Sequence, residues 1–514
     1  MTSALTDLLR ADLTAAHYSV SALTGLWGVE ADAALHRNQR VPARRALAAL
    51  SAKLARVEPT STLAQLFVLG IPVPTEQLSG ALPLLGLAGA VRLGLVAEVG
   101  DQVRPLVDLR PYSFIDAAGA GSWWIISDLG ELALGHPLGE SHVLGVGGAS
   151  LTLSGLMMPT PVESVLDLGT GCGIQAMHAA RHADRVVATD ISARALELAG
   201  INARLNDIDN IEFRLGSLFD PVAGERFDHI ISNPPFVITP RVPGVPSYEY
   251  RDGGMVGDAL VEAVVRGAAA HLTPGGVAQL LGNWEYRSGT DAFERLSDWL
   301  ADTDLDAWII EREVQQPTEY AETWIRDGGT RPDTPDFDRL YGAWLDDFEA
   351  RDVSRVGFGY LMLRRPVTGP PVLRRLERLP DALGHNAAGI GTHLAGCLAA
   401  HDWQAARDDA ELARAILTVA PDVTEERHYW PGQDDPTLMT LHQGSGFGRS
   451  VPLTTPLAAL VGACDGELAV GAIVGALAQL LEADERALLA ELLPQVRELL
   501  ADGFLQVPES APLS

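Results

Sequence analysis

The sequence predicts an α/β protein with a mainly parallel central β-sheet, covered by helices on both faces and flanked by smaller helical domains. Three observations lead to this fold class. Short apolar runs alternate with helical patterns from Val165 onward, and strands that alternate with helices pair in parallel. The stretch VLDLGTGCGI (165–174) has the form of a strand, a tight glycine loop and a helix start. A length of 514 residues suggests about three domains.

Residues 1–115 are predicted to form a winged-helix-like domain. Apolar residues recur at helical spacing in 42–57, and the pattern returns around 62–70 and 81–91. Residues 92–109 then alternate as the two strands of a hairpin do. Helices followed by a hairpin are the elements of a winged helix.

Residues 116–365 are predicted to form the central α/β domain, which begins with a glycine-rich approach up to residue 155. An aromatic-rich insertion, residues 315–352, separates the last two predicted strands, and either a lid or a surface decoration fits its composition. Seven runs are predicted as strands: SVLDL, RVVATD, IEFRL, FDHIIS, VAQLLG, AWIIEREV and VGFGYLMLRR.

The C-terminal part is predicted to be a separate domain. Residues 366–380, PVTGPPVLRRLERLP, are rich in proline and are predicted to be a linker. Residues 381–514 are predicted to be a helical domain, with a winged arrangement as one option, because helical patterns surround a strand-like run.

The amino-acid composition limits which cellular compartment and which binding partners we expect for this protein. The net charge is −29, from 38 basic and 67 acidic residues, which opposes non-specific attraction to nucleic acid or to an anionic membrane. The longest apolar run, 468–481, is shorter than the roughly 20 residues that a membrane-spanning helix needs. Three cysteines cannot form a disulfide framework, and the first residues lack the pattern of a signal peptide. We therefore expect a cytoplasmic protein without a membrane segment.

One segment is basic, although the protein as a whole is acidic. Residues 33–57 contain no acidic residue. The segment is either a patch that contacts RNA or phosphate, or a solvated helix face that happens to be basic. Its basic residues are Arg37, Arg40, Arg44, Arg45, Lys53 and Arg56.

The glycine loop after the first strand indicates a ligand. Gly169, Gly171 and Gly173 let backbone amides approach a bound molecule closely. Asp167 precedes the loop, and its carboxylate would repel a pyrophosphate but suits a ligand with an ammonium and a sulfonium group. S-adenosylmethionine is such a ligand. The alternative is a tight strand-to-helix turn without a ligand.

The next two strands add to this site. The second strand ends at Asp190, about 20 residues after the loop, where a carboxylate can accept hydrogen bonds from both ribose hydroxyls. Alternatively, Asp190 caps the following helix, a role that Ser192 can also fill. The third strand leads into GSLFDP (216–221), where we expect the adenine ring.

With these motifs in place, residues 142–365 resemble class I S-adenosylmethionine-dependent methyltransferases. The glycine loop, Asp190 and NPPF (233–236) match the family's glycine-rich motif, ribose acid and amino-methylating NPP(Y/F) motif, in the family's order. HVLGVGGASLTLSGL (142–156) resembles the segment that covers the methionine moiety. The resemblance implies a seven-stranded Rossmann-like methyltransferase sheet and S-adenosyl-L-methionine as cofactor.

The resemblance also implies which residues bind the cofactor. Ser217 departs from the family's pattern, because relatives often have an acidic residue there that binds the adenine amino group. The expected cofactor-binding residues are Asp167, Gly169, Thr170, Gly171, Gly173, Asp190, Ile191, Ser217, Leu218 and Asn233.

The tetrapeptide Asn233, Pro234, Pro235 and Phe236 is the predicted catalytic motif. An amide or an exocyclic amine is a poor nucleophile because its nitrogen lone pair is delocalised. The Asn233 side-chain oxygen and the Pro234 carbonyl can each accept one N–H bond and turn that lone pair towards the methyl donor. Phe236 offers a ring face on which a planar group can stack. The alternative is an NPP turn that only ends a strand.

Further residues are expected near the same sheet edge. Phe236, Tyr250 and Arg251 are predicted to contact the substrate, although a structural loop is an equal alternative for the segment around Tyr250. Asn283 and Trp284 follow the fifth strand, where Trp284 can simply pack. No spacing of His, Cys and acidic residues indicates a metal, so we expect none.

The motif family acts on glutamine side chains of proteins, such as release factors, and on amino groups of bases in RNA or DNA. The acidic composition favours a protein glutamine, whereas the flanking domains and the basic segment favour a base in ribosomal or transfer RNA. A non-catalytic binding module that keeps the fold is a third hypothesis. The presence of both Asn233 and the glycine loop argues against it.

Overall fold

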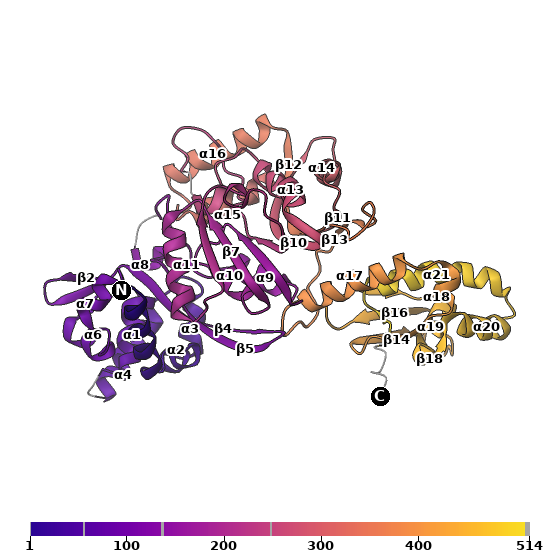
Figure 1. The fold of residues 1–514 in the computed structure, drawn as a ribbon, viewed down its shortest axis with the longest axis horizontal. Coiled ribbons are helices and arrows are strands. Elements are labelled where there is room, and N and C mark those ends of the chain that lie inside the picture. The colour runs from indigo at the N-terminus through magenta and orange to yellow at the C-terminus, as the bar shows by residue number, and fades with distance from the viewer. Residues whose placement is uncertain (1, 55–56, 135–137, 247–248, 509–514) are drawn as a thin grey trace. The chain divides into compact units, whose positions relative to one another are not determined.

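The computed structural model describes all residues except 1, 55–56, 135–137, 247–248 and 509–514. The chain divides into two compact units (Figure 1). The first comprises Met1–Ser154 and Pro161–Arg378, and the second comprises Gly155–Thr160 and Leu379–Ser514.

The first unit begins with a helical region that carries a small sheet. Strands β1 (Val73–Pro74), β2 (Val96–Val99) and β3 (Gln102–Pro105) pair antiparallel in the order β1-β3-β2. The predicted hairpin is therefore present, but whether the region is a winged helix stays a prediction. The helices are α1 (Thr2–Ala15), α2 (Val20–Trp27), α3 (Val29–Leu35), α4 (Val41–Leu54), α5 (Pro59–Leu63), the π-helical turn η1 (Ala64–Val68), α6 (Thr75–Ala81) and α7 (Gly86–Arg92).

A long hairpin joins this region to the central domain. Strands β4 (Val107–Asp116) and β5 (Gly119–Asp128) pair along their full length. The buried Tyr18 hydroxyl donates to the Leu109 carbonyl (2.8 Å), and the Trp124 ring N–H donates to the Tyr18 carbonyl (2.6 Å). These bonds hold the helices to the hairpin. Helices α8 (Glu131–Leu134) and α9 (Gly148–Leu156) follow.

The central sheet has eight strands in the order β13-β11-β12-β10-β9-β6-β7-β8. Only β12 runs antiparallel to its neighbours. The inner strands β6 and β9 are largely buried, because helices pack against the sheet. The strands are β6 (Val162–Leu168), β7 (Ala183–Asp190), β8 (Ile211–Leu215), β9 (Phe227–Ser232), β10 (Leu272–Arg287), β11 (Asp306–Gln315), β12 (Val353–Arg364) and β13 (Arg374–Arg378).

All seven predicted strands are present, but the count of seven was wrong. The eighth, β13, lies in the segment predicted as a linker and pairs parallel with β11. Its sequence, RRLER, has one apolar residue. An edge strand hydrogen-bonds a neighbour on one side only and tolerates charged residues, so no hydrophobic pattern indicated it.

The helices pack on the sheet around the site. Helices α10 and α11 pack on β6, β7 and β8, and α13 and α14 pack on β10. The helices of this domain are α10 (Ile174–Ala179), α11 (Ala193–Leu205), the 3-10 turn η2 (Asp220–Val222), α12 (Glu249–Asp252), α13 (Ala259–His271), α14 (Ala292–Leu300), α15 (Pro317–Asp327) and α16 (Pro335–Ala350).

The second unit combines helices with two small sheets, β18-β14-β19 and β15-β16-β17. Within the described part of the chain, no helix is long and apolar enough to cross a membrane. The helices are α17 (Gly391–Ala405), α18 (Asp409–Ala413), α19 (Thr455–Gly462), α20 (Val470–Leu480) and α21 (Glu485–Ala501). The strands are β14 (Ile416–Val419), β15 (Val423–His428), β16 (Leu438–Gln443), β17 (Ser450–Pro452), β18 (Asp465–Ala469) and β19 (Leu505–Gln506).

Candidate active site

The register of the parallel strands places the predicted motifs at one edge of the sheet. Leu168, the last residue of β6, pairs with Ser232 of β9 on one side and with Thr189 of β7 on the other. Asp190 pairs with Leu215 of β8. The segments that follow these strands, including the glycine loop and the NPPF motif, therefore begin side by side at the carboxyl edge, where open α/β sheets bind ligands.

The glycine loop has the backbone conformation that requires glycine. Gly169, Gly171 and Gly173 all have positive φ angles, of 77°, 55° and 88°. A β-carbon at Gly173 would lie 2.9 Å from the Ala199 side chain of α11, so this glycine lets α11 approach. A β-carbon at Gly169 or Gly171 would meet nothing within 4 Å, so the outer side of the loop is open.

Asp167 lies beneath the loop and is 1% exposed. Its Oδ2 accepts hydrogen bonds from the Thr170 hydroxyl (2.5 Å) and from the Ala176 backbone N–H (2.9 Å). Its Oδ1 is buried and has no partner among the described residues. Burial raises the pKa of Asp167 to about 7, because the two hydrogen bonds offset only part of the desolvation.

Asp190 ties the second strand to the same loop. Its carboxylate accepts the Gly171 N–H (2.9 Å) and the Ser192 N–H (2.8 Å), and burial raises its pKa. Ser192 is the residue whose side chain caps α11, so Asp190 is not the cap. Ile191, between them, is 62% exposed and presents an apolar surface at this edge.

The loop after β8 lies next to Asp190, because the Gly216 N–H donates to the Asp190 carbonyl (2.9 Å). Ser217 is exposed, and Leu218 is half-buried with a φ angle of +46°. A leucine in the left-handed region is uncommon and strained, a feature that concentrates at functional sites.

The predicted cover segment also approaches the loop region. The Gln175 side-chain amide at the start of α10 donates to the Ser150 carbonyl of α9 (2.7 Å). Part of the segment 142–156, which resembles the family's segment over the methionine moiety, thus lies beside α10, the helix that follows the glycine loop.

The NPPF motif leaves β9 beside the glycine loop. The Ser232 hydroxyl donates to the Leu168 carbonyl (2.8 Å), which fixes this strand end against β6. The Asn233 Oδ1 atom is buried and has no hydrogen-bond partner in the described part of the chain. Phe236 is half-buried, and its ring lies 5.5 Å from that of Phe358, centroid to centroid.

The insertion holds the segment that follows this motif. Tyr320 of α15 is 3% exposed, and its hydroxyl accepts the backbone N–H of Ile238 (3.0 Å) and the Asn283 side-chain amide (2.5 Å). The predicted strand pattern places Asn283 at this edge but does not indicate Tyr320. The only available signal was an aromatic residue at a helical position within the insertion. Trp284 packs in the core and donates to Glu311 (2.8 Å).

The insertion is therefore part of a core rather than a surface decoration. Val237 and Ile238 pack together with buried side chains from both insertion helices. Those side chains are Tyr320, Ala321, Ile325, Phe337, Leu340, Trp344 and Phe348.

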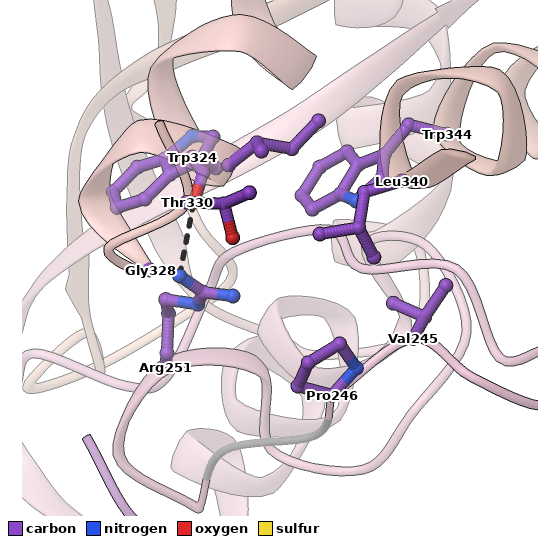
Figure 2. Close-up of a pocket in the computed structure, with 9 residues that line it drawn as sticks. Val245, Pro246, Arg251, Trp324, Gly328, Thr330, Leu340 and Trp344 are labelled. Carbon is purple, nitrogen blue, oxygen red and sulfur yellow. Dashed lines mark hydrogen bonds between the residues drawn. The ribbon is translucent and has the colours of Figure 1, made fainter. Parts of the chain in front are cut away.

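Arg251 also contacts the insertion. It is buried and donates to the Trp324 carbonyl (3.0 Å), as Figure 2 shows, with Asp327 at 3.8 Å. Its side chain lines a cavity of about 20 Å³ with Pro246 and Trp344, room for about one water molecule. The geometry thus gives Arg251 a structural role in joining α12 to α15, and its predicted substrate contact stays a prediction. The side chain of Tyr250 lies outside the described residues.

The basic segment lies on and beside α4. Arg37 and Arg40 donate to the Ala33 and Leu69 carbonyls. Arg44, Arg45 and Lys53 are exposed on α4, and Arg56 lies outside the described residues. Across the described ranges, no group of three or more His, Cys, Asp and Glu side chains is arranged to hold a metal ion.

The central domain matches a methyltransferase family, as its sheet and the motifs at its carboxyl edge predict. Residues 147–295 match the family described as methyltransferase small domain. Residues 15–106 and 395–507 match two families described as domains of unknown function, DUF7059 and DUF7782.

The methyltransferase domain has relatives of two kinds. The chain is 39% identical over 147 residues to the ribosomal protein uL3 glutamine methyltransferase of Bradyrhizobium diazoefficiens, covering 27% of this chain and 45% of that protein. It is 39% identical over 131 residues to the release factor glutamine methyltransferase of Xylella fastidiosa, covering 24% and 47%. It is 30% identical over 164 residues to ribosomal RNA small subunit methyltransferase C of Salmonella newport, covering 32% and 43%. The chain thus spans about half the length of these relatives, to which its central domain is distantly homologous.

Proposed function

We propose that this protein is an S-adenosylmethionine-dependent N-methyltransferase that acts on a planar NH2 group, with a protein glutamine side chain as the favoured acceptor. The observation that carries the proposal is the Asn233 Oδ1 atom, which is buried without a partner among the described residues at the carboxyl edge. A buried polar atom without a partner costs about 1–3 kcal/mol. An N–H group of the acceptor would remove that cost.

We call Asp167, the glycine loop, Asp190 and Ile191 the cofactor half of the carboxyl edge, and the residues from Asn233 to Ile238 the acceptor half. The residues of the cofactor half fit S-adenosylmethionine. The unpartnered Asp167 Oδ1 suits the ammonium group of the methionine moiety. Both Asp190 oxygens keep lone pairs for the ribose hydroxyls, because each accepts one backbone N–H. Ile191 offers an apolar surface to the adenine ring. When bound, the cofactor supplies a methyl group on a positively charged sulfur.

The chain's own residues then prepare the acceptor. Asn233 Oδ1 and the Pro234 carbonyl each accept one N–H of the acceptor, which turns the nitrogen lone pair towards the methyl group. Phe236, backed by Phe358, supports the planar group. Transfer would form the N–CH3 bond as the S–CH3 bond breaks, so the sulfur would keep the electron pair of that bond and the methylated nitrogen would lose one of its protons to water.

The choice of acceptor rests on charge and on the relatives. The net charge of −29 opposes binding to RNA, and two of the relatives are named glutamine methyltransferases. A base in ribosomal or transfer RNA is the second candidate. Arg44, Arg45 and Lys53, exposed on α4, favour it.

Labelling of a cell extract tests both proposals. The protein is incubated with the extract and methyl-labelled S-adenosylmethionine, and the product is then treated with protease or with ribonuclease. We expect protease to release the label. Release by ribonuclease would favour the RNA acceptor, and no binding of S-adenosylmethionine at millimolar concentration would contradict the cofactor assignment.

A further inference from the structure

Asn202 of α11 and Asn206, the C-cap residue of that helix, bind the backbone of the hairpin strand β5. Asn202 accepts the Ile126 N–H and donates to the Ile126 carbonyl, both at 2.8 Å. Asn206, one helical turn later, makes the same pair of bonds with Trp124, also at 2.8 Å. The two side chains thus hydrogen-bond the open edge of β5 as a neighbouring strand would, and α11 packs against β5 (Figure 1).

The two asparagines differ in their third hydrogen bond. The second amide hydrogen of Asn202 goes to the Cys172 carbonyl in the glycine loop (2.9 Å). The corresponding hydrogen of Asn206 goes to the Asn202 carbonyl within its own helix (2.8 Å). Asn202 is 0% exposed and uses both donors and its acceptor, so it links the hairpin, α11 and the glycine loop.

The bond to Cys172 holds the part of the loop that must stay ordered. Cys172 lies between Gly171 and Gly173, which adopt positive φ angles here. Glycine has no β-carbon, so the chain on both sides of Cys172 is conformationally free unless contacts hold it. Its buried carbonyl would lose the Asn202 donor if the side chain were shortened. One residue before Cys172, the Gly171 N–H donates to the Asp190 carboxylate. Displacement of the loop at Cys172 would therefore disturb the predicted ribose site.

We propose that Asn202 is a positioning residue that couples the β4–β5 hairpin to the glycine loop. The inference rests on the proposed function, because the ligand of the loop is the proposed cofactor. A loop that is ordered before binding loses less entropy on binding, so Asn202 strengthens cofactor affinity without touching the cofactor. Asn206 supports the same hairpin without this effect.

Calorimetric titration of S-adenosylhomocysteine into the full-length chain tests the proposal. We expect Asn202→Ala to raise the Kd about tenfold, the cost of one buried hydrogen bond. The matched control, Asn206→Ala, should change the Kd by less than about twofold. Hydrogen exchange without ligand should show faster exchange in the loop, residues 169–173, for Asn202→Ala but not for Asn206→Ala.

Equal Kd changes in both variants, or an unchanged Kd in a folded Asn202→Ala protein, would overturn the inference. If Asn202→Ala does not fold, Asn202→Ser takes its place, because its short hydroxyl cannot span both Ile126 and Cys172. We expect that variant to raise the Kd at least about fivefold. Failure of the wild-type chain to bind S-adenosylhomocysteine would instead overturn the proposed function, and this inference with it.

Discussion

The two halves of the carboxyl edge are held by different means. In the cofactor half, Asp167 and Asp190 bind backbone and side-chain groups at most 19 positions away, all within one strand–helix–strand unit. In the acceptor half, Ile238 depends on Tyr320, 82 positions along the chain, and Phe236 packs on Phe358. We therefore expect changes in the insertion to affect the proposed acceptor half without disturbing the proposed cofactor half. The two halves should therefore respond separately to mutation.

The largest expected effect is on the acceptor half. Asn233→Ala removes the buried oxygen that we propose binds the N–H of the methyl acceptor, and we expect methyl transfer to fall about a thousandfold. The Kd for S-adenosylhomocysteine should change by less than about threefold. Single-turnover transfer and calorimetry measure the two quantities. Asn210→Ala is the control, because Asn210 binds the Ala180 and Ala183 carbonyls, away from this edge. Full activity of Asn233→Ala would refute the mechanism.

The next effect concerns Asp167 and pH. Burial raises its pKa to about 7 in the ligand-free protein, whereas the cofactor's ammonium favours the carboxylate. Binding below pH 7 must therefore release a proton, so affinity should fall as pH falls, by about tenfold per unit below pH 7. Calorimetry between pH 7 and 5.5, in buffers with different ionisation enthalpies, counts that proton. In Asp167→Asn the proton release should disappear, and its persistence would exclude Asp167 as the titrating group.

A smaller effect is expected for the second acid of the cofactor half. Asp190→Asn keeps the shape of the side chain but removes its charge, so we expect the Kd for S-adenosylhomocysteine to rise about tenfold. Asp209→Asn, an exposed change in the loop before β8, is the control and should leave the Kd unchanged. If Asp190→Asn lowered acceptor turnover at saturating cofactor instead, the separation of the two halves would be wrong.

The smallest effect sharpens the role of the insertion. Tyr320→Phe removes the hydroxyl that Ile238 and Asn283 share but keeps the packed ring. We expect kcat/KM for the acceptor to fall about fivefold, with cofactor affinity unchanged. Tyr341→Phe is the matched control, because that hydroxyl lies 3.4 Å from Glu322 in the same insertion. A changed cofactor Kd in Tyr320→Phe alone would show that the halves are coupled.

Sequence patterns predicted the strands and the glycine loop of the cofactor half, because the contacts of Asp167 and Asp190 are local. Alternating strands and helices fix the parallel order, and the glycine loop requires backbone angles that other residues avoid. Strand β13 escaped prediction because an edge strand needs no apolar pattern. Tyr320 and Asn202 escaped prediction because their partners are far away in the chain, and nothing in their sequence neighbourhoods identifies those partners.

By itself, the sequence determined the α/β fold class, the seven principal strands and the motifs that belong together at the carboxyl edge. These features depend on residue periodicity and on local backbone conformation, which neighbouring residues specify. Only the tertiary structure decided that the insertion forms a core with residues 237–238, and that Asn202 joins the hairpin to the glycine loop. Such contacts depend on which distant segments pack together, because a hydrogen bond or a buried side chain needs a partner that local sequence does not name.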